Sequence, residues 1–177
     1  MKKTLVSAAL FMTLACNAQA GPLDFMKGWS KSNFYMGLLV SNSDIDGETG
    51  AGLDMSVINA TLGYSLGKGL SVEGRFGAGS DQAESLFQDP VSNYAAGMLR
   101  YHYTWKNKIM AYAAAGGATR VHSNVVEADR NQTGAAFALG MNLFGSAKTA
   151  INVEYFYMGG AQATKSIGIG FHHYFGN

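Results

Sequence analysis

The sequence is poor in cysteine, in surplus charge and in long apolar runs, and each shortage excludes a class of protein. Its single cysteine, Cys16, lies in the N-terminal segment of residues 1–20. If that segment is removed, the mature chain forms no disulfide and no cysteine-ligated metal site. Basic and acidic residues number 13 and 12, which gives no electrostatic case for a nucleic-acid partner. No apolar stretch after residue 20 resembles a membrane helix, which disfavours a helical membrane protein.

The first 20 residues have the three parts of a secretory signal peptide. Lys2 and Lys3 form the basic segment, and residues 4–15 form an apolar segment too short to span a membrane as a helix. Residues 18–20, Ala-Gln-Ala, fit the small-x-small cleavage rule. We therefore expect the mature chain to begin at Gly21.

The expected organisation is a cleaved signal peptide over residues 1–20, a short periplasmic leader over residues 21–32 and one domain over residues 33–177. A lipoprotein cleaved before Cys16 is the alternative. It is disfavoured because Thr13 stands where such sites resemble one another in having leucine.

Eight segments of this domain alternate large apolar residues with small or polar ones, which is the pattern of strands with two different faces. The expected strands cover about residues 33–41, 55–66, 70–79, 93–105, 109–120, 133–144, 149–158 and 166–175. The segment 109–120 is so rich in alanine and glycine that its facing stays open, with Arg120 placed inward.

The connections between these segments alternate in length. Polar loops of about seven to fourteen residues alternate with tight turns at residues 67–69, 106–108 and 145–148. A soluble β-sandwich has no reason to keep its long loops at one end, whereas outer-membrane barrels have short periplasmic turns and longer external loops. Since an open sheet edge in lipid leaves backbone groups unpaired, we predict an all-β fold, an eight-stranded antiparallel up-and-down transmembrane β-barrel.

The last segment is long enough, at about ten residues, to cross a bilayer as a tilted strand, and it ends in an aromatic residue. Its large apolar residues recur at every second position and form a candidate assembly signal: Ile167, Ile169, Phe171 and Phe175.

Taken together, these features resemble the small eight-stranded outer-membrane barrels of the OmpA/OmpX and opacity-like porin kind. The resemblance covers the whole mature chain, and the motifs that carry it are residues 34–37 (Phe-Tyr-Met-Gly), 112–117, 153–155 (Val-Glu-Tyr) and the last strand. It departs from the family at His173, where another aromatic is usual, and at the two residues that follow Phe175. A soluble periplasmic or lipocalin-like β-protein is the alternative.

The resemblance implies a location in the outer membrane of a Gram-negative bacterium. It also implies contact with outer-membrane lipid and lipopolysaccharide, and assembly by the barrel assembly machinery through the last strand. The protein is expected to be a monomer without a cofactor.

The alternation places charged residues inside a lumen that side chains can fill in a barrel of this size. We predict a lumen charge network of Glu73, Arg75, Arg100 and Glu154. Further residues expected to face inward are His102, Asn142, Asn152 and Arg120. Because isolated buried charge is costly, a plug of paired charges is favoured over an ion path or an active site.

Two histidine pairs invite a catalytic or metal-binding interpretation. His122-Ser123, with Glu127 nearby, resembles the His and Ser of outer-membrane lipid A hydrolases, but that family spaces them His-x-Ser on one face. Adjacent residues in a strand point to opposite faces, so neither this pair nor His172-His173 has the required geometry.

The acidic stretch 44–48, Asp-Ile-Asp-Gly-Glu, lacks the ligand spacing of a calcium loop and is expected to be a solvated turn. No metal site is predicted.

These observations favour a non-enzymatic barrel with a structural or surface-interaction role, in which external loops meet a host or envelope ligand. A narrow channel or porin for small solutes is the alternative, and a lipid A-modifying enzyme embedded in the barrel is a third and weaker one.

We predict that Phe175→Ala impairs assembly far more than deletion of residues 176–177, because the alternating pattern ends at Phe175. The measurement is the amount of folded protein in outer-membrane fractions. Equal losses in the two variants would show that the signal does not end at Phe175.

Overall fold

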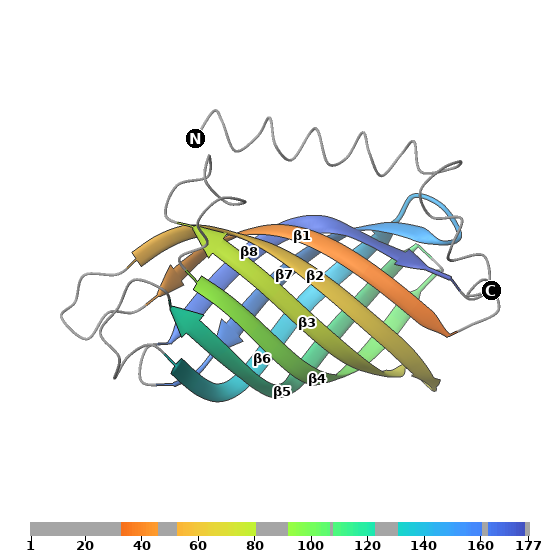
Figure 1. Cartoon of the computed structure of the whole chain (residues 1–177). Coiled ribbons are helices and arrows are strands. Elements are labelled where there is room, and N and C mark those ends of the chain that lie inside the picture. The colour runs from red at the N-terminus through yellow and green to blue at the C-terminus, as the bar shows by residue number, and fades with distance from the viewer. Residues whose placement is uncertain are drawn as a thin grey trace, which may run out of the picture.

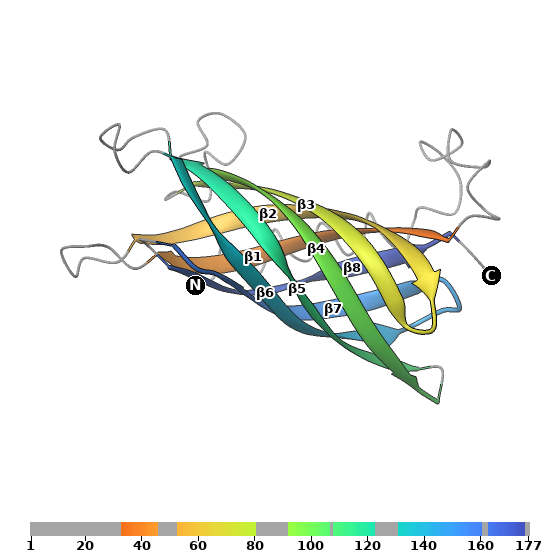
Figure 2. The same cartoon turned by 90° about the horizontal axis from the view of Figure 1, so that it is seen from below.

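The strands form one closed barrel in a computed structural model, which describes residues 33–45, 53–80, 92–106, 108–122, 131–160 and 163–175. In chain order they are β1 (Phe34–Ile45), β2 (Leu53–Gly67), β3 (Leu70–Ser80), β4 (Ser92–Trp105), β5 (Ile109–His122), β6 (Asn131–Phe144), β7 (Thr149–Met158) and β8 (Thr164–Tyr174). Each strand pairs antiparallel with the next and runs obliquely around a common axis (Figures 1 and 2). The predicted eight-stranded up-and-down barrel is confirmed.

Pairing of β1 with β8 closes the sheet. Their register runs from Tyr35 opposite Tyr174 to Ile45 opposite Thr164 without interruption. In a bilayer an open edge would leave amide and carbonyl groups without partners, at a cost of several kcal/mol for each group. Closure therefore allows a sheet of this kind to cross a membrane. Within the described ranges, no helix combines the length and the apolar content needed to cross a membrane.

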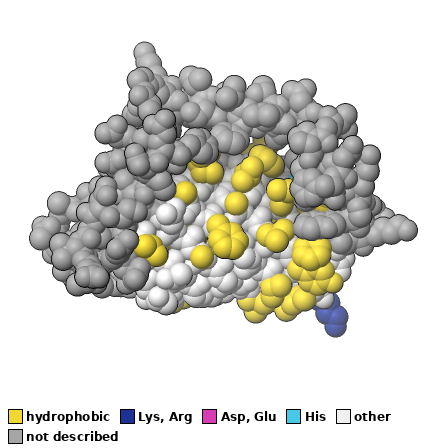
Figure 3. Space-filling model, in the orientation of Figure 1, with side chains coloured by type: hydrophobic (Ala, Val, Ile, Leu, Met, Phe, Trp, Pro, Cys, Tyr) yellow, Lys and Arg dark blue, Asp and Glu magenta, His cyan; other side chains and the backbone are white. Residues whose placement is uncertain are grey.

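Large apolar side chains are exposed on the outer side of every strand from β2 to β8. Among the most exposed are Tyr103 (68%), Ile167 (65%) and Phe76 (60%). Figure 3 shows hydrophobic side chains spread over the visible described wall. A soluble protein would bury such residues, so their exposure indicates that this wall faces lipid.

Inside the barrel, four glycines lie directly opposite an aromatic ring on the neighbouring strand. The pairs are Gly37 with His172, Gly63 with Tyr35, Gly77 with Tyr94 and Gly140 with Tyr112. A Cβ atom on any of these glycines would overlap the opposing ring. The missing side chains thus make the space in which the rings fill the lumen.

The strands extend further toward the loop end than the hydrophobic pattern predicts. β1 continues to Ile45, so Asp44 belongs to a strand and lies between Asp54 and Lys165 rather than in a loop. Ladder pairing continues wherever both partners stay extended, whether or not the outward residues are apolar. A pattern based on hydrophobicity therefore ends too early. By contrast, β7 has the predicted ends.

Two of the tight turns place a lysine in the left-handed backbone region. Lys68, between β2 and β3, has φ 52°, and Lys106, between β4 and β5, has φ 50°. Gly69 follows Lys68 with φ 81°, where a Cβ atom would come within 2.5 Å of the His102 carbonyl oxygen. These short turns join neighbouring strands at the end of the barrel opposite the loops.

We predict that Gly140→Ala lowers the free energy of unfolding by about 1–3 kcal/mol, the usual cost of overpacking, because its methyl group overlaps the Tyr112 ring. The measurement is urea-induced unfolding in lipid vesicles. Gly97→Ala is the matched control, since no atom lies within 4 Å of a Cβ at that position. Equal midpoints for the two variants would contradict the packing explanation.

Candidate functional site

The candidate site is the polar network in the middle and turn half of the lumen. Glu73 and Arg75 are two residues apart on β3 and therefore share its inner face. Arg100 comes from β4 and Glu154 from β7. Strand β7 is a neighbour of neither β3 nor β4 in the sheet. The barrel is narrow enough that side chains from these strands meet across it.

Three ion pairs link the four charged residues. Glu73 Oε2 lies 2.6 Å from Arg75 Nη2, and Glu73 Oε1 lies 2.8 Å from Arg100 Nη1. Arg75 Nη1 reaches across to Glu154 Oε1 at 2.7 Å. All four residues are buried, with at most 7% exposed. Two carboxylates and two guanidinium groups balance one another, which offsets the desolvation of each charge.

Tyrosines complete the coordination of both carboxylates. The Tyr35 hydroxyl donates to Glu73 Oε1 at 2.7 Å, and the Tyr112 hydroxyl donates to Glu154 Oε2 at 2.6 Å. The Arg100 guanidinium lies 3.7 Å from the centre of the Tyr112 ring, a cation–π contact. The two tyrosines are also the rings that lie over Gly63 and Gly140, so the packing of the barrel positions the hydrogen bonds of the network.

A branch of amides extends this network toward the turn end. Asn152 Nδ2 donates to the Tyr112 hydroxyl and to Asn142 Oδ1, both at 2.8 Å. Asn142 Nδ2 donates to the Tyr174 hydroxyl at 2.7 Å. Buried amides are costly unless paired, and here each has partners on other strands.

His172 is buried in the same region, over Gly37, and is held by rings. Its ring centre lies 6.0 Å from that of Tyr35, 6.4 Å from that of Tyr112 and 6.3 Å from that of Tyr174. Its Nδ1 has no hydrogen-bond partner among the residues that the structure describes. His172 therefore acts here as a space-filling aromatic residue.

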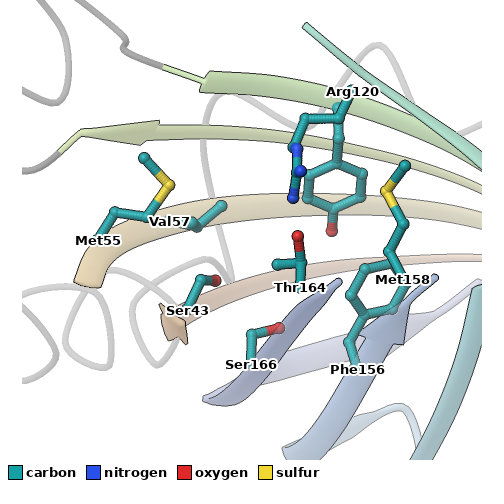
Figure 4. A pocket seen from close by; sticks show the side chains of 9 residues that line it. Ser43, Met55, Val57, Arg120, Phe156, Met158, Thr164 and Ser166 are labelled. Carbon is teal, nitrogen blue, oxygen red and sulfur yellow. The ribbon is translucent and has the colours of Figure 1, made fainter. Parts of the chain in front are cut away.

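The loop half of the lumen mixes apolar side chains with hydroxyl, amide and guanidinium groups. A cavity with about 20 Å³ of space for water centres lies there, large enough for about one water molecule (Figure 4). Its walls include Ser43, Met55, Val57, Tyr94, Arg120, Phe156, Met158, Thr164 and Ser166. Arg120 extends from β5 into this half and donates through Nη2 to Gln132 Oε1 at 2.8 Å.

The structure brings together Glu73, Arg75, Arg100 and Glu154, and it also places Asn142 and Asn152 beside them. His102 is half-buried on β4, while Arg120 is buried in the other half of the lumen. Sequence reasoning overlooked the roles of Tyr35, Tyr112 and His172. The alternation already placed Tyr35 and His172 on the inner face, but only the cross-strand register identifies the partners that these residues meet.

The last strand holds Ile167 and Ile169 outward, 65% and 40% exposed, as its alternation predicts. Phe175 differs from them, since it follows the end of β8 and is buried. Its ring packs edge-on against His173 at 4.8 Å, and its N–H donates to the Phe34 carbonyl oxygen at 2.9 Å.

Several sequence-based candidates lie outside the described side chains. These are His122, Ser123, Glu127, Asp46, Gly47 and Glu48, together with residues 1–32 and the last two residues. Among the residues that are described, no three His, Cys, Asp or Glu side chains gather closely enough to hold a metal ion.

Known structures contain barrels of the same shape. Neisserial surface protein A aligns with a TM-score of 0.65 and 11% identity, over 81% of this chain and 97% of that one. Ail of Yersinia pestis aligns with a TM-score of 0.59 and 14% identity, over 81% and 98%. OprG of Pseudomonas aeruginosa aligns with a TM-score of 0.57 and 13% identity, over 83% and 98%. At these identities the likeness shows the fold alone.

Ail has also been solved in complex with the heparin analogue sucrose octasulfate. None of the curated proteins matches this sequence at a significant level. The model of one family, the outer membrane protein beta-barrel domain, matches residues 6–172. Because this match extends over nearly the whole chain and the fold agrees with it, the chain belongs to the outer membrane protein beta-barrel domain family and is an outer-membrane protein.

Proposed function

We propose that this barrel is plugged and non-enzymatic, and that it has a structural or surface-interaction role carried by its external loops. The observation that supports this most directly is the bridge from Glu73 through Arg75 to Glu154, which joins β3 to β7 across the lumen. A continuous aqueous path would have to pass this bridge and the aromatic rings around it.

The loop half of the lumen supports the same proposal. The described side chains there leave a cavity the size of about one water molecule. Its lining combines methionine, valine and two aromatic rings with the polar side chains of Ser43, Arg120, Thr164 and Ser166. A hydrated ion is larger than one water molecule, so this cavity is too small to hold one. A channel for small solutes is the second candidate, and it requires the network to open.

The charge of the loop end favours some partners over others. Acidic residues dominate the four external connections and the strand ends beside them: Asp44, Asp46, Glu48, Asp54, Asp81, Glu84, Asp89, Glu127 and Asp129. The basic residues in the same stretches are Arg130 and Lys165. A sulfated glycan like the one bound by Ail would be repelled here, so we propose a partner with a basic surface, or lipopolysaccharide bridged by cations.

The last strand carries a second proposed role, in assembly. Its outward residues Ile167 and Ile169, with Phe171 and Phe175, would be recognised by the barrel assembly machinery. The burial of Phe175 at the seam between β1 and β8 supports a role in closing the barrel.

We predict that the wild-type protein shows no steady channel openings in planar lipid bilayers, because the paired charges and rings fill the lumen. The measurement is single-channel conductance, recorded with a known porin as a positive control. Steady and reproducible openings in the wild-type protein would overturn the plug and favour the channel.

We predict that Glu154→Gln lowers the urea midpoint of unfolding in lipid vesicles. The amide keeps the shape and a hydrogen-bond acceptor but leaves the two arginines with one carboxylate, and breaking a buried pair costs about 3–5 kcal/mol when the site is dry. Val153→Leu, on the lipid-facing side of the same strand, is the control and should unfold at the wild-type midpoint. A Glu154→Gln variant as stable as wild type would refute the network as a stabilising element.

A further inference from the structure

The outer wall carries a groove that the proposed function does not use. It runs along β5, where Ala113 and Ala115 form the floor. Larger residues stand on both sides: Leu99 and Tyr101 on β4, and Phe137 and Leu139 on β6. These four are 50–61% exposed. The groove has a volume of about 420 Å³, within the roughly 300–1,000 Å³ of ligand pockets.

The register explains the shape of this groove. Ala113 lies between Tyr101 and Leu139, and Ala115 lies between Leu99 and Phe137. The same order continues toward the turn, where Ala111 lies between Tyr103 and Met141. A small residue on the middle strand is thus flanked by two large ones in successive rows, which leaves a channel as wide as one strand.

The groove leads toward a basic turn. Lys106 and Lys108, between β4 and β5, are both exposed, and Lys106 Nζ lies 5.4 Å from the centre of the Trp105 ring. Lys68 and Lys148 occupy the other two tight turns, so each turn carries positive charge and none carries an acidic residue. Tryptophan and lysine side by side are typical of a membrane interface, where the cation meets lipid phosphate.

The distances fit one leaflet of a bilayer. Ala113 lies five residues from Lys108, which is about 17 Å along the strand at roughly 3.4 Å per residue. Half of the hydrocarbon core is about 15 Å thick. A lipid whose phosphate meets the turn lysines therefore has acyl chains that reach the groove.

We propose that this groove is a binding site for an anionic glycerophospholipid of the periplasmic leaflet. Its phosphate is held by Lys106 and Lys108, and one acyl chain lies along Ala111, Ala113 and Ala115. The proposal rests on the location in the outer membrane and on turns that face the periplasm, and it is independent of whether the lumen conducts. A second copy of this chain seated in the groove is the competing occupant.

The test uses Trp105 as the reporter, in a Trp29→Phe background that leaves it the only tryptophan. The protein is placed in phosphatidylcholine vesicles that contain a minor fraction of brominated lipid. In one sample this lipid is phosphatidylglycerol and in the other it is phosphatidylcholine, and both are brominated near the headgroup. Bromine quenches tryptophan on contact, so the ratio of quenching by the two lipids measures their relative occupancy beside Trp105. We expect phosphatidylglycerol to be preferred at least threefold.

Two variants separate a site from general attraction. Lys106→Gln with Lys108→Gln should bring the ratio to about one, and Ala113→Phe with Ala115→Phe should lower it although both lysines remain. Lys68→Gln is the matched control, because Lys68 has the same left-handed backbone in another turn, and it should leave the ratio unchanged.

Three outcomes would overturn the proposal. The first is equal quenching by the two lipids in the starting protein. The second is a loss in Lys68→Gln as large as that in the Lys106 and Lys108 variant, which would show a diffuse basic collar and no site. The third is a dimer in sedimentation that Ala113→Phe with Ala115→Phe abolishes, which would assign the groove to a second copy. Conductance measured on the same samples tests the plug separately.

Discussion

The constraint on which this structure depends is that every backbone N–H and C=O inside hydrocarbon needs a partner within the protein. A sheet meets it only by closing, and here the pairing of β1 with β8 achieves closure. Closure with eight strands in turn produces a lumen that is only wide enough for side chains. What lies inside then follows from packing: glycine lies opposite four of the inner rings, and the charges of Glu73, Arg75, Arg100 and Glu154 are paired.

The packing and the polar network stabilise each other. Tyr35 and Tyr112 each fill the space over a glycine and also donate to a carboxylate that would otherwise be less fully satisfied. Arg75 then joins the two carboxylates, so strands that are not neighbours in the sheet are tied together through the lumen. Because each of these tyrosines both packs over a glycine and donates to a carboxylate, a change in barrel packing also alters the electrostatics of the lumen.

The barrel is polarised along its axis. In the sequence, acidic residues are concentrated in the longer connections and the strand ends beside them, where Arg130 and Lys165 are the basic residues. The three tight turns carry lysines and no acidic residue, and the described wall between is apolar. This division matches the environments of the outer membrane, with a polar exterior on one side and phospholipid headgroups on the other. The proposed interaction at the cell surface and the proposed interaction with periplasmic lipid would thus use opposite ends of the same molecule.

The sequence by itself determined the strands, their number and, except for β5, their facing, because a period of two with a lipid-facing side leaves a strong signal. It also indicated which charges face inward, since Glu73 and Arg75 alternate with the large apolar residues of β3 and so lie on the same face as its small residues. It predicted strand ends less well, as at Asp44, because the ladder continues beyond the apolar band. Only the tertiary structure decided the facing of β5, the burial of Phe175 and the contacts of Arg75 with Glu154, Tyr112 with Gly140 and Tyr101 with Ala113. The physical reason is that alternation along one strand shows only which side of the sheet a residue faces. Which residue it contacts depends on the register between strands and on how the sheet closes.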